Sequence, residues 1–167
     1  MSKRTDIIKY DLDSYDKHCC LKPSLAMIAA AAFACRAYLL PLLIVVGSLK
    51  GGAHYEVNAL LGEQRTLAML TQLPALLVIY AMVRRKPSAS AAARWIWKRG
   101  RLLLAASLVA DLWLLAGGSE LQVDVVGAFA DDPGAFARIG IDVAVLLYLS
   151  VSTRVKDTFA DFPIAQT

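Results

Sequence analysis

The sequence predicts an all-α polytopic membrane protein with four transmembrane helices and with both termini in the cytosol. Four apolar runs, at residues 25–48, 66–82, 102–118 and 136–152, are each near the length that crosses about 30 Å of hydrocarbon. Fourteen of the lysines and arginines lie in the first, third and fifth of the polar segments around these runs, and only three lie in the other two connections. This alternation follows the positive-inside rule and predicts the orientation.

The composition agrees with this fold class. Apolar residues make up 57% of the 167 residues and the mean hydropathy is +0.52, whereas soluble domains have roughly 45–50% apolar residues. The chain divides into an N-terminal cytosolic segment at 1–22, a four-helix transmembrane domain at 23–153 and a cytosolic tail at 154–167. The net charge is +4, and most of the basic residues behind it flank the runs, where they attract anionic lipid headgroups. We therefore expect the lipid bilayer as a partner and no nucleic acid.

The first two runs have recognisable starts and interruptions. Ser24 has the residue type of a helix N-cap at the start of the first run, and the small residues at 26–34 offer a flat face for close helix approach. Pro41 and Pro74 lie inside the first and second runs, and each removes a backbone donor, so we expect kinks near both. The basic residues and the proline at 84–87 end the second run.

An interfacial helix is predicted ahead of the third run. Ser88 or Ser90 can cap a helix that continues through 91–97 into residues 102–118. Trp95 and Trp97 stand beside basic residues, a pattern typical of the membrane–water interface, so we expect both to be interface anchors.

The last connection, residues 119–135, is acidic and carries no basic residue. Asp132 and Pro133 have the residue types of an N-cap and a first helical position, which predicts the start of the final helix there. That helix is expected to end near Thr153.

Three charged residues lie within the apolar runs: Arg36, Asp111 and Asp142. A charge at the centre of a bilayer costs about 2.5–3.5 kcal/mol on insertion scales, so such residues face protein or water and have a partner. We expect Arg36 to pair with Asp111 first, because both lie near the middle of their runs, and Arg138 to pair with Asp142 at i, i+4. The charges could form a proton or ion relay, a buried ion pair that sets helix register, or a docking charge for another membrane subunit.

Metal and cofactor sites are not predicted. His18 and His54 are expected on opposite sides of the membrane and lack other ligands at suitable spacing. Cys19, Cys20 and Cys35 do not form a disulfide framework. The chain contains none of the common catalytic or nucleotide-binding motifs, so we expect no cofactor and no enzymatic activity.

The N-terminal segment is unusual because it is rich in aspartate and tyrosine on the side where basic residues prevail. It is a candidate interaction segment, docked on either membrane or protein, through Tyr10, Asp11, Asp13, Tyr15 and Asp16.

The stretch 10–16, followed by Leu21-Lys22-Pro23 and then by Arg36-Ala37, resembles the YfeZ-like family of small bacterial inner-membrane proteins. The resemblance implies four spans, a proteobacterial inner membrane and a shared role for the N-terminal segment and Arg36. It supplies no catalytic residues.

These features predict a non-enzymatic accessory or scaffold subunit of the bacterial inner membrane that associates with itself or with a larger membrane complex. The alternative is a small transporter or channel-like protein that uses Arg36 and Asp111 as an ion or proton site. A membrane enzyme that acts on lipid is the least supported class.

Overall fold

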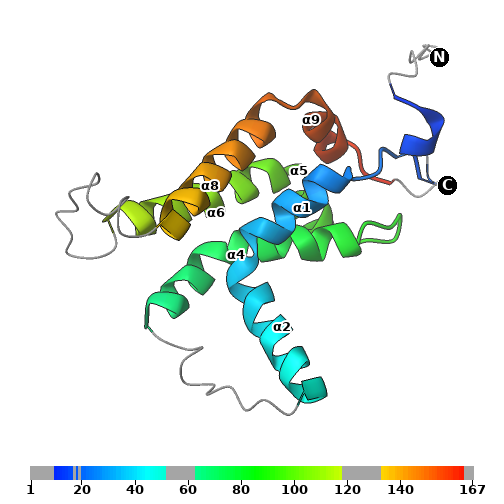
Figure 1. Cartoon of the computed structure of the whole chain (residues 1–167). Helices are drawn as coiled ribbons and strands as arrows, with labels where there is room; N and C mark the ends of the chain where they lie inside the picture. Colours follow the sequence, from blue (N-terminus) through cyan, green and yellow to red (C-terminus); the bar gives the residue numbers. More distant parts are fainter. Residues whose placement is uncertain (1–9, 17, 19, 52–62, 118–132, 164–167) are drawn as a thin grey trace, which may run out of the picture.

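The computed structural model describes residues 10–16, 18, 20–51, 63–117 and 133–163, and within these ranges the fold is all-helical, as predicted. Figure 1 shows the short 3-10 helix η1 and the α-helices. The connections at 52–62 and 118–132 lie outside the described residues, and so do His54, Cys19 and Asp132. The helices are α1 (Leu25–Ala34), α2 (Arg36–Gly51), α4 (Glu63–Val83), α5 (Ala91–Lys98), α6 (Gly100–Gly117), α8 (Pro133–Val151) and α9 (Thr153–Ala160), after η1 (Leu12–Ser14).

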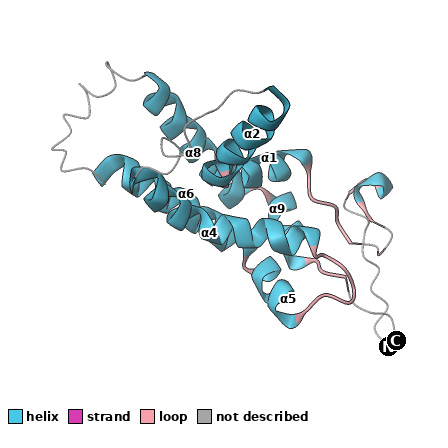
Figure 2. Ribbon diagram, turned by 90° about the horizontal axis from the view of Figure 1, so that it is seen from below, coloured by secondary structure: helices cyan, strands magenta, loops and turns pink. Residues whose placement is uncertain are grey.

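Helices α4 and α6 form the most extensive helix pair and run side by side in Figure 2. Helix α1 packs across both of them, and α8 packs against α6. Helices α5 and α9 contact each other and the start of α6, and the described residues of the N-terminal segment, from Tyr10 onward, lie at this same end of the molecule (Figure 1).

Two helix breaks bend the chain. Helices α1 and α2 meet at 72° around Cys35, and α8 and α9 meet at 66° around Ser152. The first break lies six residues before Pro41, so the expected kink is displaced, and Pro41 itself lies inside α2. Pro74 lies inside α4, which continues as one helix, and the nearby Ala75 N–H bonds to the Ser107 hydroxyl of α6 at 3.1 Å. A neighbouring hydroxyl thus compensates for a local weakening of the helix.

Within the described residues, one helix is long and apolar enough by itself to cross a membrane, at Thr66–Val83 of α4. Two more candidates qualify if each bent pair is one span, namely α1 with α2 and α8 with α9. The structure therefore supports one to three candidate spans, and four spans with a defined orientation remain a prediction.

The sequence identifies two helix starts correctly. Ser24 accepts from Met27 N at 3.2 Å and caps α1, and Ser90 accepts from Ala93 N at 3.2 Å and caps α5. The expectation of one helix from 91 into the third run is wrong, because α5 ends at Lys98 and α6 begins at Gly100. The first part of the expected tail also forms a helix, α9, which ends at Ala160 and is capped by Ser152.

The core lies where α1, α4 and α6 meet. Small side chains let these helices approach closely, since Ala31, Ala34, Ala75 and Ala81 are all buried. Larger side chains extend the core toward α9, including Met27, Val78, Trp97, Leu104, Leu108, Val155 and Phe159. Many leucines and valines on the outer faces of the helices are exposed, which fits an apolar environment around the molecule.

A buried charge cluster at a helix break as the candidate functional site

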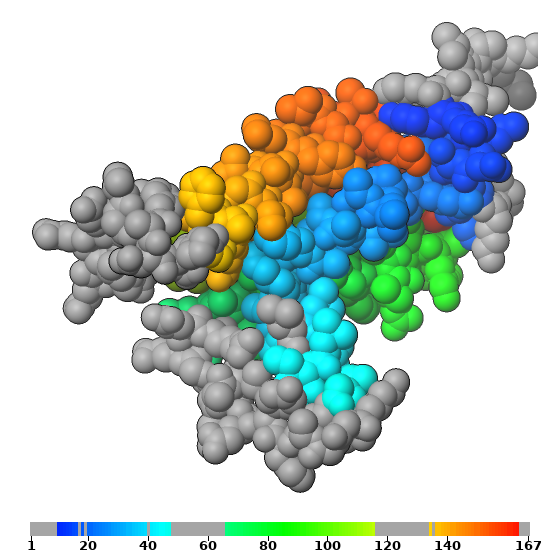
Figure 3. All heavy atoms as spheres, in the orientation of Figure 1, coloured from blue at the N-terminus to red at the C-terminus, as the bar shows by residue number. Residues whose placement is uncertain are grey.

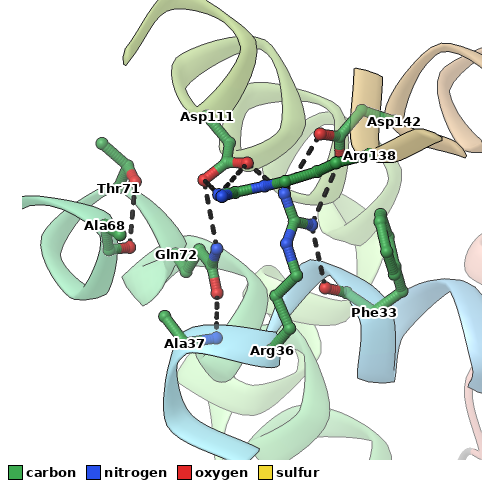
Figure 4. Close-up of polar contacts among 9 residues, drawn as sticks. All are labelled: Phe33, Arg36, Ala37, Ala68, Thr71, Gln72, Asp111, Arg138 and Asp142. Atoms are coloured by element: carbon green, nitrogen blue, oxygen red, sulfur yellow. Dashed lines mark hydrogen bonds and ion pairs between the residues drawn. The ribbon is translucent and has the colours of Figure 1, made fainter. Parts of the chain in front are cut away.

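Three helices bring four charged side chains together (Figure 4). Arg36 comes from the first residue of α2, Asp111 from α6, and Arg138 and Asp142 from α8. Arg36 holds Asp142 with a two-pronged contact, Nη1 to Oδ1 and Nη2 to Oδ2, each at 3.1 Å, and its Nη2 also donates to Asp111 Oδ2. Arg138 Nη2 donates to both oxygens of Asp111, at 3.1 Å and 2.9 Å.

The cluster is neutral, and its acids are deeply buried. Asp111 and Asp142 are 1% and 0% exposed, whereas the side chain of Arg36 is 14% exposed and that of Arg138 is 39% exposed. Two carboxylates and two guanidinium groups sum to no net charge. Pairing of this kind offsets the desolvation of ions in an apolar interior.

The break between α1 and α2 lies directly beside this cluster. Ending one helix at Ala34 and starting another at Arg36 frees backbone groups that a continuous helix would satisfy. The freed Ala37 N–H donates to Gln72 Oε1 of α4 at 2.8 Å, and the carbonyl of Phe33 accepts from Arg36 Nη1 at 3.1 Å. Gln72 and Arg36 therefore supply hydrogen bonds to backbone groups that the break would otherwise leave unpaired in an apolar core.

Gln72 links the break to the acids, and the sequence reasoning missed it. Its amide Nε2 donates to Asp111 Oδ1 at 3.2 Å while its oxygen holds Ala37 N, so one side chain connects α2, α4 and α6. Gln72 is 1% exposed. An amide inside an otherwise apolar run was the available signal.

The structure places the residues singled out in the runs as follows. Arg36 and Asp111 lie together, and Asp142 joins the same arginine. Arg138 binds Asp111 on the neighbouring helix and not Asp142 on its own helix, so the second expected pair is replaced by a cross-helix pair. The i, i+4 spacing was a poor guide because a contact between helices satisfies the buried Asp111, which a contact within α8 would leave with one cation fewer.

The arrangement is closed. Each of the four carboxylate oxygens accepts from an arginine or from Gln72, and both acids are shielded. Such a network joins helices, whereas a site that exchanges protons needs an acid that water can reach. Across the described ranges, no three or more His, Cys, Asp or Glu side chains group as a metal site.

The described residues of the N-terminal segment contact helix α9 of the same chain. Figure 3 shows residues near 10–22 lying against α9. Tyr10 donates to Asp157 Oδ2 at 2.7 Å, Leu21 N donates to Asp161 Oδ2 at 2.8 Å, and Arg154 contacts Ser14 Oγ at 3.4 Å.

Within the segment, the acidic and aromatic candidates have different roles. Asp16 accepts from the backbone of His18 and Cys20 and holds a tight turn, and Tyr15 forms a β-bridge with Leu21. Asp11 and Asp13 are exposed. Tyr10 and Asp16 are thus engaged within the chain, which leaves the two exposed acids available to another surface.

The two candidate anchors differ in burial. Trp95 is 53% exposed, with the Arg99 guanidinium 4.3 Å from its ring centre. Trp97 is fully buried, donates from Nε1 to the carbonyls of Thr158 and Asp161, and packs on Phe159 with ring centres 4.9 Å apart. Trp97 is therefore a core residue of the α5–α9 contact, and the anchoring role stays a prediction for Trp95 alone.

The fold and the site together define an all-helical protein in which four charged side chains, with no net charge, lie beside a break between two helices. The family described as "Protein of unknown function (DUF2919)" matches the chain over residues 10–161, so the protein belongs to that family. The match includes the whole cluster, the N-terminal segment from Tyr10 and helix α9. No curated protein and no solved structure matches the chain.

Proposed function

We propose that the protein is an integral membrane protein with four spans and with both termini in the cytosol. The YfeZ-like resemblance implies the four spans and the bacterial inner membrane. The basic residues flanking alternate ends of the apolar runs support this orientation. The cluster supports the four spans, because each of the four runs contributes a polar side chain to it: Arg36, Gln72, Asp111 and Asp142. Four spans that meet at one depth would bring these side chains together.

Within that membrane, the proposed function is a non-enzymatic accessory or scaffold subunit that associates with itself or with a larger membrane complex. The closure of the charge cluster carries this proposal. Asp111 and Asp142 are buried and fully hydrogen-bonded, which favours a lock between helices over a site of turnover. A rigid small bundle of this kind suits a partner in an assembly.

Helix α1 offers a surface for such an association. Ala30, Ala31 and Ala34 of its small-residue run are buried within the chain, but Ala26 and Ala29 are exposed. Exposed small residues let another helix approach closely in a bilayer. We expect a partner helix to pack on this face.

Photo-crosslinking in intact membranes tests the association. A photo-reactive amino acid introduced at position 29 should give a discrete crosslinked species, identified by mass spectrometry as a second copy or a membrane protein. The same amino acid at position 143 is the matched control, since Val143 is exposed on α8. The proposal fails if neither position 26 nor position 29 crosslinks above the control and if gently extracted protein is a lone monomer.

A small transporter or channel-like protein is the second candidate, and the helix break favours it. Discontinuous helices near charged residues form the binding sites of many transporters. In the part of the chain that the structure describes, the buried Arg36 Nε has no hydrogen-bond partner, and a bound water or anion would satisfy it.

Flux measurements separate the two candidates. Purified protein in liposomes with an internal pH dye should carry no proton flux above empty liposomes if it is a scaffold. Flux that is lost in Asp111→Asn, but kept in Asp13→Asn at an exposed position, would replace the scaffold proposal with the transporter.

A further inference from the structure

A polar cavity opens where α4 ends and α5 begins, away from the charge cluster. Its volume is about 280 Å³, and it is lined by Tyr80, Arg84, Lys86, Ser88, Ala89 and Ser90. The proposed orientation puts this end of α4 at the cytosolic surface of the membrane. The half-exposed Trp95 of α5 follows closely in the chain, as expected of a segment at the interface.

The three consecutive basic residues at 84–86 are used in two ways. Arg85 faces inward, where it donates to the carbonyls of Leu21 and Asp161 at 2.7 Å and 3.1 Å and lies 4.9 Å from the centre of the Trp97 ring. Arg84 and Lys86 instead line the cavity. The chain therefore uses one cation to hold its own fold and turns the other two toward this opening.

Among the described residues, nothing compensates the charge of the cavity. The described part of the lining contains no acidic residue, and neither Arg84 nor Lys86 forms a salt bridge within the described ranges. Arg84 lies 5.9 Å from the centre of the Tyr80 ring, an aromatic contact that leaves its N–H donors for another acceptor. Two cations without a carboxylate favour an anionic occupant.

The neutral groups of the lining suit phosphate oxygens. Tyr80, Ser88 and Ser90, whose side chains carry hydroxyl groups, line the cavity together with the two cations. The Ser90 oxygen accepts from Ala93 N, so its hydroxyl hydrogen is available to donate. Phosphate groups are commonly held by lysine and arginine together with hydroxyl donors.

An apolar stripe leads from the cavity along α4. Leu73, Leu76, Leu77 and Tyr80 are exposed at helical spacings that place them on the same face as Arg84. This stripe lies toward the membrane interior in the proposed orientation, where acyl chains can cover it. We propose that the cavity binds the phosphate group of an anionic phospholipid, with Arg84 and Lys86 on the phosphate and the acyl chains along the stripe.

The proposal rests on the membrane placement above but not on the accessory role. Purified protein in a neutral detergent is titrated with phosphatidylglycerol, and binding is followed by native mass spectrometry. The double variant Arg84→Gln/Lys86→Gln should weaken binding at least about tenfold, since each basic contact with an anionic headgroup is lost. The charge-conserving variant Arg84→Lys/Lys86→Arg should retain binding.

Matched controls decide whether the cavity itself is responsible. Lys98→Gln/Arg99→Gln removes the same charge from exposed positions of the same segment, and it should bind phosphatidylglycerol as the wild type does. Equal losses in both double variants would overturn the proposal in favour of general attraction. Phosphatidylcholine should bind at least about tenfold more weakly than phosphatidylglycerol, because its choline group compensates the phosphate charge.

Inorganic phosphate distinguishes the source of the anion. It should not displace phosphatidylglycerol at millimolar concentration. Displacement, or binding of phosphate without the lipid, would overturn the lipid assignment in favour of a soluble phosphate compound. If the chain were recovered outside the membrane fraction of cells, the proposed placement would fail, and the phosphate arm would still test the cavity.

Discussion

Single side chains hold the broken helix together, and Gln72 is the clearest case. Its oxygen holds the Ala37 amide freed by the break, and its nitrogen holds Asp111. Both contacts lie in a buried environment, where an unpaired amide costs the full desolvation of that group. Gln72 therefore stabilises the break through its own hydrogen bonds, as the charged residues do through theirs.

Gln72→Leu should lower the free energy of unfolding by about 1–3 kcal/mol, since the Ala37 amide loses its acceptor. Unfolding in a mixed detergent titration measures the change. Thr71→Val is the matched control, because among the described residues the Thr71 hydroxyl bonds only to the Ala68 carbonyl of its own helix. A loss equal to that of the control would show that the break does not depend on Gln72.

Charge balance in the cluster gives a second prediction at this scale. Asp111→Asn leaves two arginines facing one carboxylate and should cost about 3–5 kcal/mol of stability, as expected when one partner of a buried pair is removed. Adding Arg138→Gln restores neutrality and should recover part of that loss. The control adds Lys98→Gln, which is exposed and outside the cluster, and it should recover nothing. Thermal unfolding in detergent measures all three variants.

Cys20 lies outside the proposed spans, and its thiol titrates unusually. Burial, reinforced by nearby Asp161, raises the pKa of the Cys20 thiol from 9.0 to about 11. Because the folded state favours the uncharged thiol, this contribution to stability is fully present below pH 9.0 and is lost as the pH rises toward 11.

At neutral pH the Cys20 thiolate should be roughly a hundredfold scarcer in the folded protein than in the unfolded chain. Alkylation by iodoacetamide should slow accordingly in a variant with Cys19→Ser and Cys35→Ala. The same variant in denaturant supplies the reference rate. Folded and denatured rates within a few-fold of each other would contradict the burial of this thiol.

At the scale of elements, the turn between α5 and α6 depends on a close approach to α9. A Cβ at Gly100 would overlap the Phe159 ring, with Cε1 as the nearest atom. The Trp97 ring also packs against that ring, which limits how far the Phe159 ring can move. This packing explains why the predicted continuous helix is divided: Trp97 enters the core and Gly100 lets the chain turn beside α9.

Gly100→Ala should destabilise the protein by about 1–3 kcal/mol through overpacking. Gly140→Ala is the matched control, because nothing lies within 4 Å of a Cβ there and alanine favours the helix. Thermal unfolding should move in opposite directions for the two variants. Phe159→Leu should relieve part of the Gly100→Ala defect, and its failure to do so would place the strain elsewhere.

At the scale of the whole molecule, segments that are far apart in the sequence contact one another at one end. The N-terminal segment, the end of α4, α5 and α9 meet there through Arg85, Trp97 and Asp161. These contacts require the two ends of the described chain to lie on the same side of any membrane. That requirement agrees with an even number of spans.

Labelling of single cysteines tests the four-span topology. In intact cells, an impermeant thiol reagent should label cysteines introduced at positions 54 and 124, in the two connections expected outside, but not at positions 2 and 88. All four positions should label after the cells are opened, which serves as the control. Labelling of position 54 without position 124 would reduce the number of spans to two.

Part of this fold could be read from the residues alone. Apolar runs and the caps Ser24 and Ser90 predict the helices, because hydrophobic length and backbone capping are local properties of the chain. Buried charges in those runs are equally local, so Arg36, Asp111 and Asp142 could be singled out as a group that needs partners. The sequence by itself determined the helical class and the residues that must be neutralised.

Only the tertiary structure decided how those needs are met. The break at Cys35, the role of Gln72, the pairing of Arg138 with Asp111 and the burial of Trp97 all depend on contacts between helices distant in sequence. A charged or amide side chain in an apolar run shows that a partner is needed. Which partner lies within about 3 Å of it depends on helix packing. The cavity at Arg84 and Lys86 also depends on packing, which turns Arg85 inward and leaves its two neighbours to line the cavity.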